Sequence, residues 1–277
     1  MSNWLTQANY LMMIIQVVVT LVLVPIVSFN MLKGIANNYG IHRYPQAATD
    51  VKQWLKKAGR SYWLVVLITF VLATGIVLHA IINDTELLNW DDQSGLLVIY
   101  LLSMIPVVVM VLMHKALFSL FKKYSGSIRT ASLRVRTWRE YISAPLAVTI
   151  VFANIVFIAT VLYFVAHPFD GFAGYGNLVG LVILDSLFIG IIAVVYRDNK
   201  MQGLAQPVHR DALKKRAIHI NMLILAIAVF HLSLSMWLQG TELINYKLLL
   251  QSLYFQVILI ITALCLTLPK SVFEKER

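Results

Sequence analysis

Seven stretches of about 20 mostly apolar residues constrain the fold of this chain more than any other feature of its sequence. An apolar helix of that length crosses the hydrocarbon core of a bilayer, and each intervening segment carries charges or turn-forming residues. The predicted spans cover residues 8–31, 61–82, 94–116, 144–166, 177–196, 218–238 and 248–269. The sequence therefore predicts an all-α, polytopic membrane protein whose residues 1–277 form a single seven-helix transmembrane domain.

Composition excludes several classes of protein. Only 13% of the 277 residues are charged and 59% are hydrophobic, whereas soluble domains carry about 25% charged residues. Soluble enzymes and nucleic-acid-binding domains are therefore disfavoured, despite a net charge of +10. The single cysteine, Cys265, leaves no second thiol for a disulfide or a dithiol metal site. Common hydrolase and nucleotide-binding motifs are missing, so the sequence favours a protein without catalytic residues.

The basic residues predict an orientation. Of the 23 Lys and Arg residues, 22 fall in alternate segments, and only Lys247 falls on the opposite side. Short translocated loops avoid Lys and Arg, so we expect the amino terminus outside and the carboxyl terminus in the cytoplasm of a plasma (inner) membrane. The first ten residues contain no Lys or Arg, which indicates a retained first helix rather than a signal peptide.

After the first span the chain repeats a basic segment, a span, an outer loop and a returning span three times. This order indicates one helix followed by three parallel-repeat hairpins. In the first basic segment, residues 46–59, apolar and charged side chains fall on opposite faces of a helix, which predicts a cytoplasmic amphipathic helix at the membrane surface. The candidates for contact with a partner or with anionic lipid headgroups are Trp54, Lys56, Lys57, Arg134 and Arg136.

Asp185 is the only acidic residue within a predicted span, and ionisable groups at membrane depth are functional candidates. Counted from the outer ends of their spans, Asp185 and His231 share a depth of about 12 Å at about 1.5 Å per residue. Other polar residues predict an outward-facing layer around them, namely Thr74, Ser103, Asn154, Ser235 and Gln256. Such a layer would exchange a proton or hold a cation; the alternative is a hydrogen bond that only ties helices together.

Three functions fit this pattern. The first is transport of a small solute or ion, including proton-coupled transport, or a channel with an outward-facing polar cavity. The second is a non-transporting membrane anchor or regulatory subunit that binds a protein partner through its basic cytoplasmic face; the alternative to a protein partner is a homo-oligomer. The third is electron transfer with a haem or metal, for which the weak ligand candidates are His79, His167 and His231. Cofactor occupancy is otherwise not indicated, and no nucleic-acid partner is expected.

Overall fold

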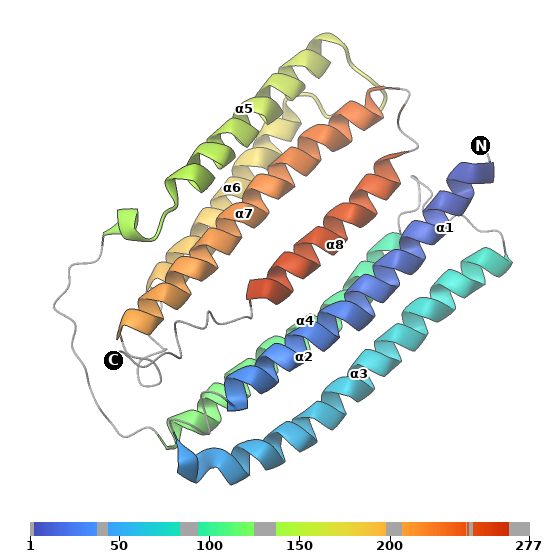
Figure 1. Ribbon diagram of the computed structural model, residues 1–277. Coiled ribbons are helices and arrows are strands. Elements are labelled where there is room, and N and C mark those ends of the chain that lie inside the picture. The colour runs from blue at the N-terminus through green and yellow to red at the C-terminus, as the bar shows by residue number, and fades with distance from the viewer. Residues whose placement is uncertain are drawn as a thin grey trace. The chain divides into compact units, whose positions relative to one another are not determined.

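The structure, a computed structural model, describes residues 3–37, 44–83, 94–124, 137–197, 207–241, 243 and 246–265. Regular secondary structure in these ranges is entirely helical, which confirms the predicted all-α class (Figure 1). Within them, six helices are long and apolar enough to cross a membrane: Tyr10–Ile35, Pro45–Ile82, Val98–Phe121, Ala144–Ala166, Gly176–Arg197 and Lys214–Gln239. The predicted seventh span contains a shorter apolar helix, Leu249–Ala263. A seventh span and the orientation stay predictions.

The chain divides into two compact units. Unit 1 comprises Met1–Arg129 and Ser252–Arg277, and unit 2 comprises Thr130–Gln251. The division falls near the start of the last helix, α8 (Lys247–Cys265), whose larger part belongs to unit 1. Each unit has its own buried apolar cluster.

Unit 1 begins with a helix that changes its winding once. α1 (Asn3–Val18) continues through the π-helical turn η1 (Val19–Leu23) into α2 (Val24–Ile35). Pro25 lies at the start of α2 and has no N–H to donate to the carbonyl four residues earlier. A π-helical turn directly before a proline re-registers the backbone hydrogen bonds, so the first predicted span is one helix with a local widening.

The third helix joins two segments that the sequence analysis separated. After a short 3-10 turn, η3 (Pro45–Ala47), α3 runs without interruption from Ala48 to Ile82 and curves along its length (Figure 1). The predicted surface segment is thus the first part of a 35-residue helix. Its Val51 is fully buried by protein, while Lys52 is exposed. The placement of this segment at the membrane surface stays a prediction.

The start of α3 is fastened to the end of α4 (Ser94–Lys122). The Tyr124 hydroxyl donates a hydrogen bond to Asp50, which raises the pKa of Tyr124 above its usual value, and Tyr44 stacks on Phe121. Deeper in unit 1, Val24, Val107, Leu259 and Ala263 form the cluster that joins α2, α4 and α8.

Unit 2 is built on α5 (Ala144–Ala166), α6 (Gly176–Arg197) and α7 (Pro207–Gln239), with the 3-10 turn η4 (Trp138–Glu140) before α5. α7 packs on both α5 and α6, and α5 has its larger contact with α7 rather than with α6. The buried side chains between them are Ala153, Phe157, Val161, Phe164, Leu181, Leu225, Val229 and Met236. In this unit the helices that follow each other in the chain, α5 and α6, share the smaller contact. The predicted repeat of three hairpins stays a prediction.

Aromatic side chains gather at the end of unit 2 where α5 turns toward α6. Phe164 contacts the rings of Phe169 and Trp237 edge-on, and the Trp237 indole N–H donates to the Thr160 hydroxyl at 3.2 Å. The turn itself uses left-handed backbone at Gly171 (φ 79°) and Gly174 (φ 59°), a conformation that glycine adopts without strain.

Candidate functional site

The polar residues predicted to form one layer belong to both units. Asn154, Asp185, His231 and Ser235 lie in unit 2, whereas Thr74, Ser103 and Gln256 lie in unit 1. The predicted layer therefore corresponds to separate groups of polar residues in the two units.

In unit 2 the polar side chain beside Asp185 is that of Asn154. The Asn154 side-chain amide lies close enough to the Asp185 carboxyl group to interact with it, and the two residues lie near the midpoints of α5 and α6. Asp185 shares a helix face with Leu184 and Phe188, which pack against the core of unit 2. The helix therefore carries the carboxyl group on the face that it turns toward its neighbours. We call these two side chains the Asn154–Asp185 pair.

The Asn154–Asp185 pair has more acceptors than donors. Oδ1 of Asp185 and Oδ1 of Asn154 are both buried and have no hydrogen-bond partner among the described residues. A carboxylate only accepts hydrogen bonds, and the amide has donors only on its nitrogen. A buried acceptor without a partner costs about 1–3 kcal/mol, and a proton or a cation bound to these oxygens would offset that cost.

His231 and Ser235 lie one turn apart on α7, and both are partly exposed. From the sequence, Asp185 and His231 share a depth, and that grouping stays a prediction; in the structure the side chain beside Asp185 is that of Asn154. Asn154 was a candidate because it is an amide in an apolar span, but depth counting placed it closer to mid-membrane than Asp185. Errors of one helical turn at the span ends are enough to produce that difference.

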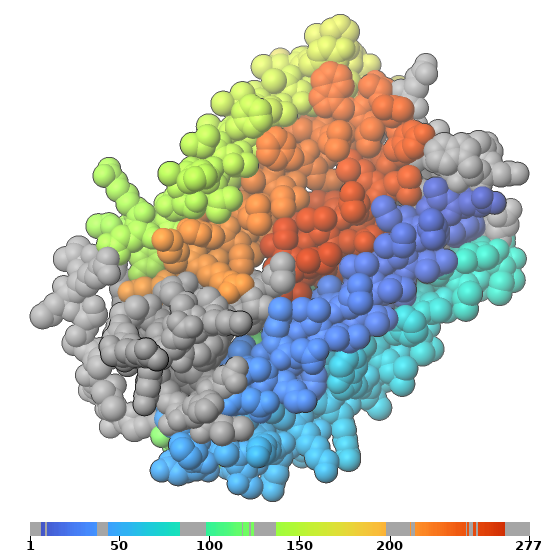
Figure 2. Space-filling view, viewed as in Figure 1, coloured from blue at the N-terminus to red at the C-terminus, as the bar shows by residue number. Residues whose placement is uncertain are grey.

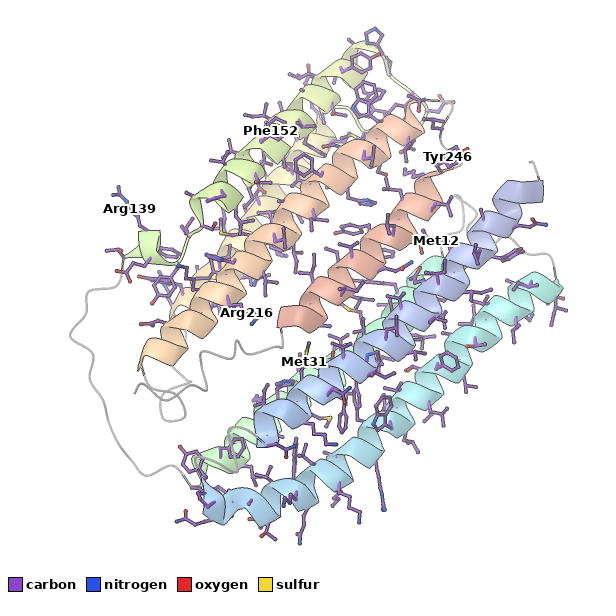
Figure 3. All side chains as sticks on the ribbon, viewed as in Figure 1. Met12, Met31, Arg139, Phe152, Arg216 and Tyr246 are labelled. Atoms are coloured by element: carbon purple, nitrogen blue, oxygen red, sulfur yellow. The ribbon has the colours of Figure 1, made fainter. Side chains whose placement is uncertain are left out.

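Unit 1 holds a buried polar network, which we define as Gln16, Thr20, Ser103, Ser252 and Gln256. The Ser252 hydroxyl donates to Oε1 of Gln16, which joins α8 to α1. Nε2 of Gln256 lies 3.5 Å from Oγ of Ser252 and 3.7 Å from Sδ of Met12. Met12 is labelled in Figure 3 on the side of α1 that faces α8.

The second half of this network joins η1 to α4. Oγ1 of Thr20 and Oγ of Ser103 are 2.8 Å apart, and both side chains are buried. Of the five network residues, only Ser103 and Gln256 were predicted from the sequence. The missed signal is spacing: Gln16 precedes Thr20 by four residues and Ser252 precedes Gln256 by four, which places each pair on one helix face.

The network is nearly satisfied. Among its described side chains, one polar atom, Nε2 of Gln16, is buried without a hydrogen-bond partner. Hydrogen bonds of this kind between apolar helices contribute to their association. The buried polar network therefore resembles a structural link, in contrast to the Asn154–Asp185 pair.

Thr74 lies apart from the network. It lines an otherwise apolar cavity of about 250 Å³ between α1 and α3, with Ile14, Val17, Val18, Phe70, Val77, Leu78 and Ile81. Its Oγ1 is buried and has no partner among the described residues. The apolar lining suits a hydrocarbon chain better than a hydrated solute.

The histidines proposed as metal or haem ligands are dispersed. His79 is exposed at the end of α3 in unit 1, and His167 is exposed at the end of α5 in unit 2. The Nδ1 atom of His167 lies 3.1 Å from the Tyr163 carbonyl oxygen, and its ring stacks on that of Tyr163. In the part of the chain that the structure describes, no three His, Cys, Asp or Glu side chains are placed to hold a metal ion.

Of the residues predicted to contact lipid or a partner, Lys56 and Lys57 are exposed and Trp54 is partly exposed on α3. Arg134 and Arg136 lie outside the described residues.

Six long apolar helices and a helical fold make this chain a multi-pass integral membrane protein. Comparison with known protein families, with curated proteins and with solved structures gives no match.

Proposed function

We propose that this protein is a transporter driven by a proton or a small cation, and that the Asn154–Asp185 pair binds this cation. The observation that supports the proposal is the pair's two buried, unpartnered oxygens near the midpoints of two apolar helices. We also propose the plasma membrane as its location, with seven spans and the amino terminus outside, on the sidedness of its basic residues.

The chemistry of the pair is simple. A proton that binds Oδ1 of Asp185 forms an O–H bond, breaks no other bond, and gives the carboxyl group a donor for Oδ1 of Asn154. Acid and amide then hydrogen-bond to each other in both directions, and the buried charge is neutralised. A small metal cation would satisfy the same two oxygens as ligands, since hard cations prefer oxygen.

The contrast with unit 1 favours a function for the pair beyond helix packing. Polar groups that serve only to hold apolar helices together are expected to satisfy one another, as those of the buried polar network largely do. Two neighbouring buried acceptors without a donor are stabilised when a cation binds them. The pair therefore has a loaded state and an empty state, and the empty state has the higher free energy. A transport cycle needs two such states, one loaded and one empty.

The test is flux through the purified full-length chain in liposomes. Proton flux is followed with a trapped pH-sensitive dye, and sodium flux with radioactive sodium. Asp185→Asn removes the carboxyl group at almost constant volume, and we expect it to abolish flux. Asp170→Asn makes the same change at an exposed loop residue of unit 2 and should leave flux unchanged. Equal flux in the parent and Asp185→Asn would contradict the proposal.

A second variant separates loss of the ion site from loss of the fold. Asn154→Asp together with Asp185→Asn exchanges the two groups across the pair and keeps its atoms. We expect the exchanged chain to recover part of the flux. Infrared difference spectra provide a readout that does not depend on transport: a protonated-carboxyl band should be present in the parent and missing in Asp185→Asn. A band shifted by sodium rather than by pH would assign the cation as sodium.

A further inference from the structure

Within unit 1, an open groove of about 630 Å³ lies between α2 and α3. Its lining consists of Phe29 and Lys33 on α2, and of Leu55, Lys56, Gly59, Arg60, Trp63, Leu64 and Leu67 on α3. The volume falls within the roughly 300–1,000 Å³ of small-molecule sites. The two helices lie side by side on the face shown in Figure 2. We call this cavity the α2–α3 groove.

The α2–α3 groove has a charged end and an apolar end. On α3 the lining changes from Lys56 and Arg60 to Leu64 and Leu67 over a rise of about 16 Å at about 1.5 Å per residue. On α2, which reaches this end of the unit just before α3 begins, the cation Lys33 comes one turn after Phe29. Three exposed cations therefore gather at one end, and none of the described residues that line the groove is acidic.

Gly59 allows close contact between α2 and α3 beneath the groove. A Cβ atom at this position would come within 2.9 Å of Cζ of Phe29, so the missing side chain lets the Phe29 ring lie directly on α3. That ring stacks on Tyr62 with centroids 5.7 Å apart and meets Trp63 edge-on at 5.8 Å. The aromatic contacts fix the inner wall of the apolar end.

We propose that the α2–α3 groove binds an anionic glycerophospholipid. The headgroup phosphate contacts Lys33, Lys56 and Arg60, and the acyl chains follow Trp63, Leu64 and Leu67 along α3. The guanidinium of Arg60 offers two parallel donors to phosphate oxygens, and Lys33 and Lys56 supply compact charges. Trp63 lies at the change from charged to apolar lining, where tryptophan is enriched at the level of lipid headgroups.

The charged end and the apolar end of the groove together favour a lipid as the occupant. An acidic peptide would match the cations but not the exposed leucines, which belong to a helix long and apolar enough to cross a membrane. A phosphatidylcholine molecule would match the leucines, but its headgroup carries a compensating positive charge. Only an anionic lipid matches both ends of the groove at once.

The test compares phosphatidylglycerol with phosphatidylcholine on the purified full-length chain in detergent. Bound lipid is counted by native mass spectrometry during titration. In the groove variant Lys33→Gln, Lys56→Gln and Arg60→Gln are combined. The control variant combines Lys52→Gln, Lys57→Gln and Lys123→Gln, which removes the same number of exposed charges from unit 1 outside the groove.

We expect the parent to bind one phosphatidylglycerol with at least tenfold preference over phosphatidylcholine, since each nearby cation contributes about fivefold to binding of anionic lipid. The groove variant should lose that preference, and the control variant should keep it. Equal losses in both variants would overturn the proposal in favour of general surface attraction. Unchanged binding in the groove variant would also overturn it.

A third probe separates a lipid site from a simple anion site. Glycerophosphoglycerol has the headgroup of phosphatidylglycerol without its acyl chains, and we expect it not to compete with the lipid. Effective competition would overturn the assignment to a lipid. Leu64→Asn together with Leu67→Asn, at exposed positions of the apolar end, tests that end independently of charge. The double variant should reduce lipid binding, and unchanged binding would overturn the placement of the acyl chains.

Discussion

Thr20 and Ser103 share two hydroxyl protons among three hydrogen bonds. Their oxygens lie 2.8 Å apart, while Thr20 also bonds the Gln16 carbonyl oxygen at 2.6 Å and Ser103 the Ile99 carbonyl oxygen at 2.8 Å. Each hydroxyl has one proton to donate, so the pair alternates between bonds along each helix and the bond between helices. The contact lies in the π-helical turn before Pro25, and three residues before Pro106 on α4.

Removing either hydroxyl should weaken the association of η1 with α4. We expect Thr20→Val and Ser103→Ala each to lower the free energy of unfolding by about 0.5–1.5 kcal/mol, with a coupling of about 0.6 kcal/mol between them. The measurement is a double-mutant cycle of unfolding in detergent micelles. Ser119→Ala, at an exposed position on the same helix, is the control and should change little. Strict additivity of the two substitutions would contradict the interhelical bond.

Gly240 should not tolerate a side chain. A Cβ atom there would come within 2.2 Å of Cε1 of Phe164 and 2.9 Å of Cδ1 of Phe169, and Phe164 is 2% exposed and cannot move aside. Overpacking of this kind costs about 1–3 kcal/mol, so Gly240→Ala should lower the unfolding temperature and change the near-ultraviolet circular dichroism of the aromatic cluster. Gly180→Ala adds a methyl group in open space on α6 and should be neutral or stabilising. Identical melting of both variants would argue against the packing described.

Lys247 should make unit 2 more stable at alkaline pH. Burial lowers the pKa of Lys247 from 10.5 to about 8, and its Nζ donates to Oε1 of Gln239 at 2.6 Å. Between pH 8 and pH 10.5 the unfolded chain holds this proton and the folded chain releases it. The unfolded state then binds more protons, so stability rises with pH in this window.

The check is the free energy of unfolding measured across that window in the parent and in Lys247→Met. The parent should gain stability relative to the variant as pH rises, while Lys215→Met, at an exposed position on α7, should follow the parent. A constant difference between the parent and Lys247→Met at all pH values would show that this lysine does not titrate in the window.

Hydropathy predicts the helices of this chain well because crossing a bilayer requires long apolar runs. The predicted segments 144–166 and 177–196 nearly coincide with α5 and α6. Hydropathy does not predict where a helix ends, because a helix can continue beyond the hydrocarbon core. At residue 60, between the predicted surface helix and the second span, Arg60 and Ser61 are exposed without breaking α3.

Depth alone does not predict which side chain lies beside Asp185. Helices that share a depth need not be neighbours, and which face of α6 meets α5 depends on packing around Leu181 and Leu184 rather than on charge. The sequence predicted only two of the five residues of the buried polar network, because depth does not show which helix face meets a neighbour. Single serines and threonines occur throughout apolar helices, and only the four-residue spacing of Gln16 with Thr20 distinguishes those that face a neighbouring helix.

The predicted topology can be tested by cysteine labelling, because only one native cysteine has to be removed. In a Cys265→Ser background, new cysteines at Gln7, Lys52 and Asp170 report on exposed positions along the chain. With the amino terminus outside, a membrane-impermeant maleimide should label Gln7→Cys and Asp170→Cys in intact cells, and Lys52→Cys only after lysis. A carboxyl-terminal tag should be protected from external protease, because seven spans place the two ends on opposite sides. If only Lys52→Cys is labelled in intact cells, the orientation is the opposite of the predicted one. If the tag is accessible and Gln7→Cys is also labelled from outside, the number of spans is even.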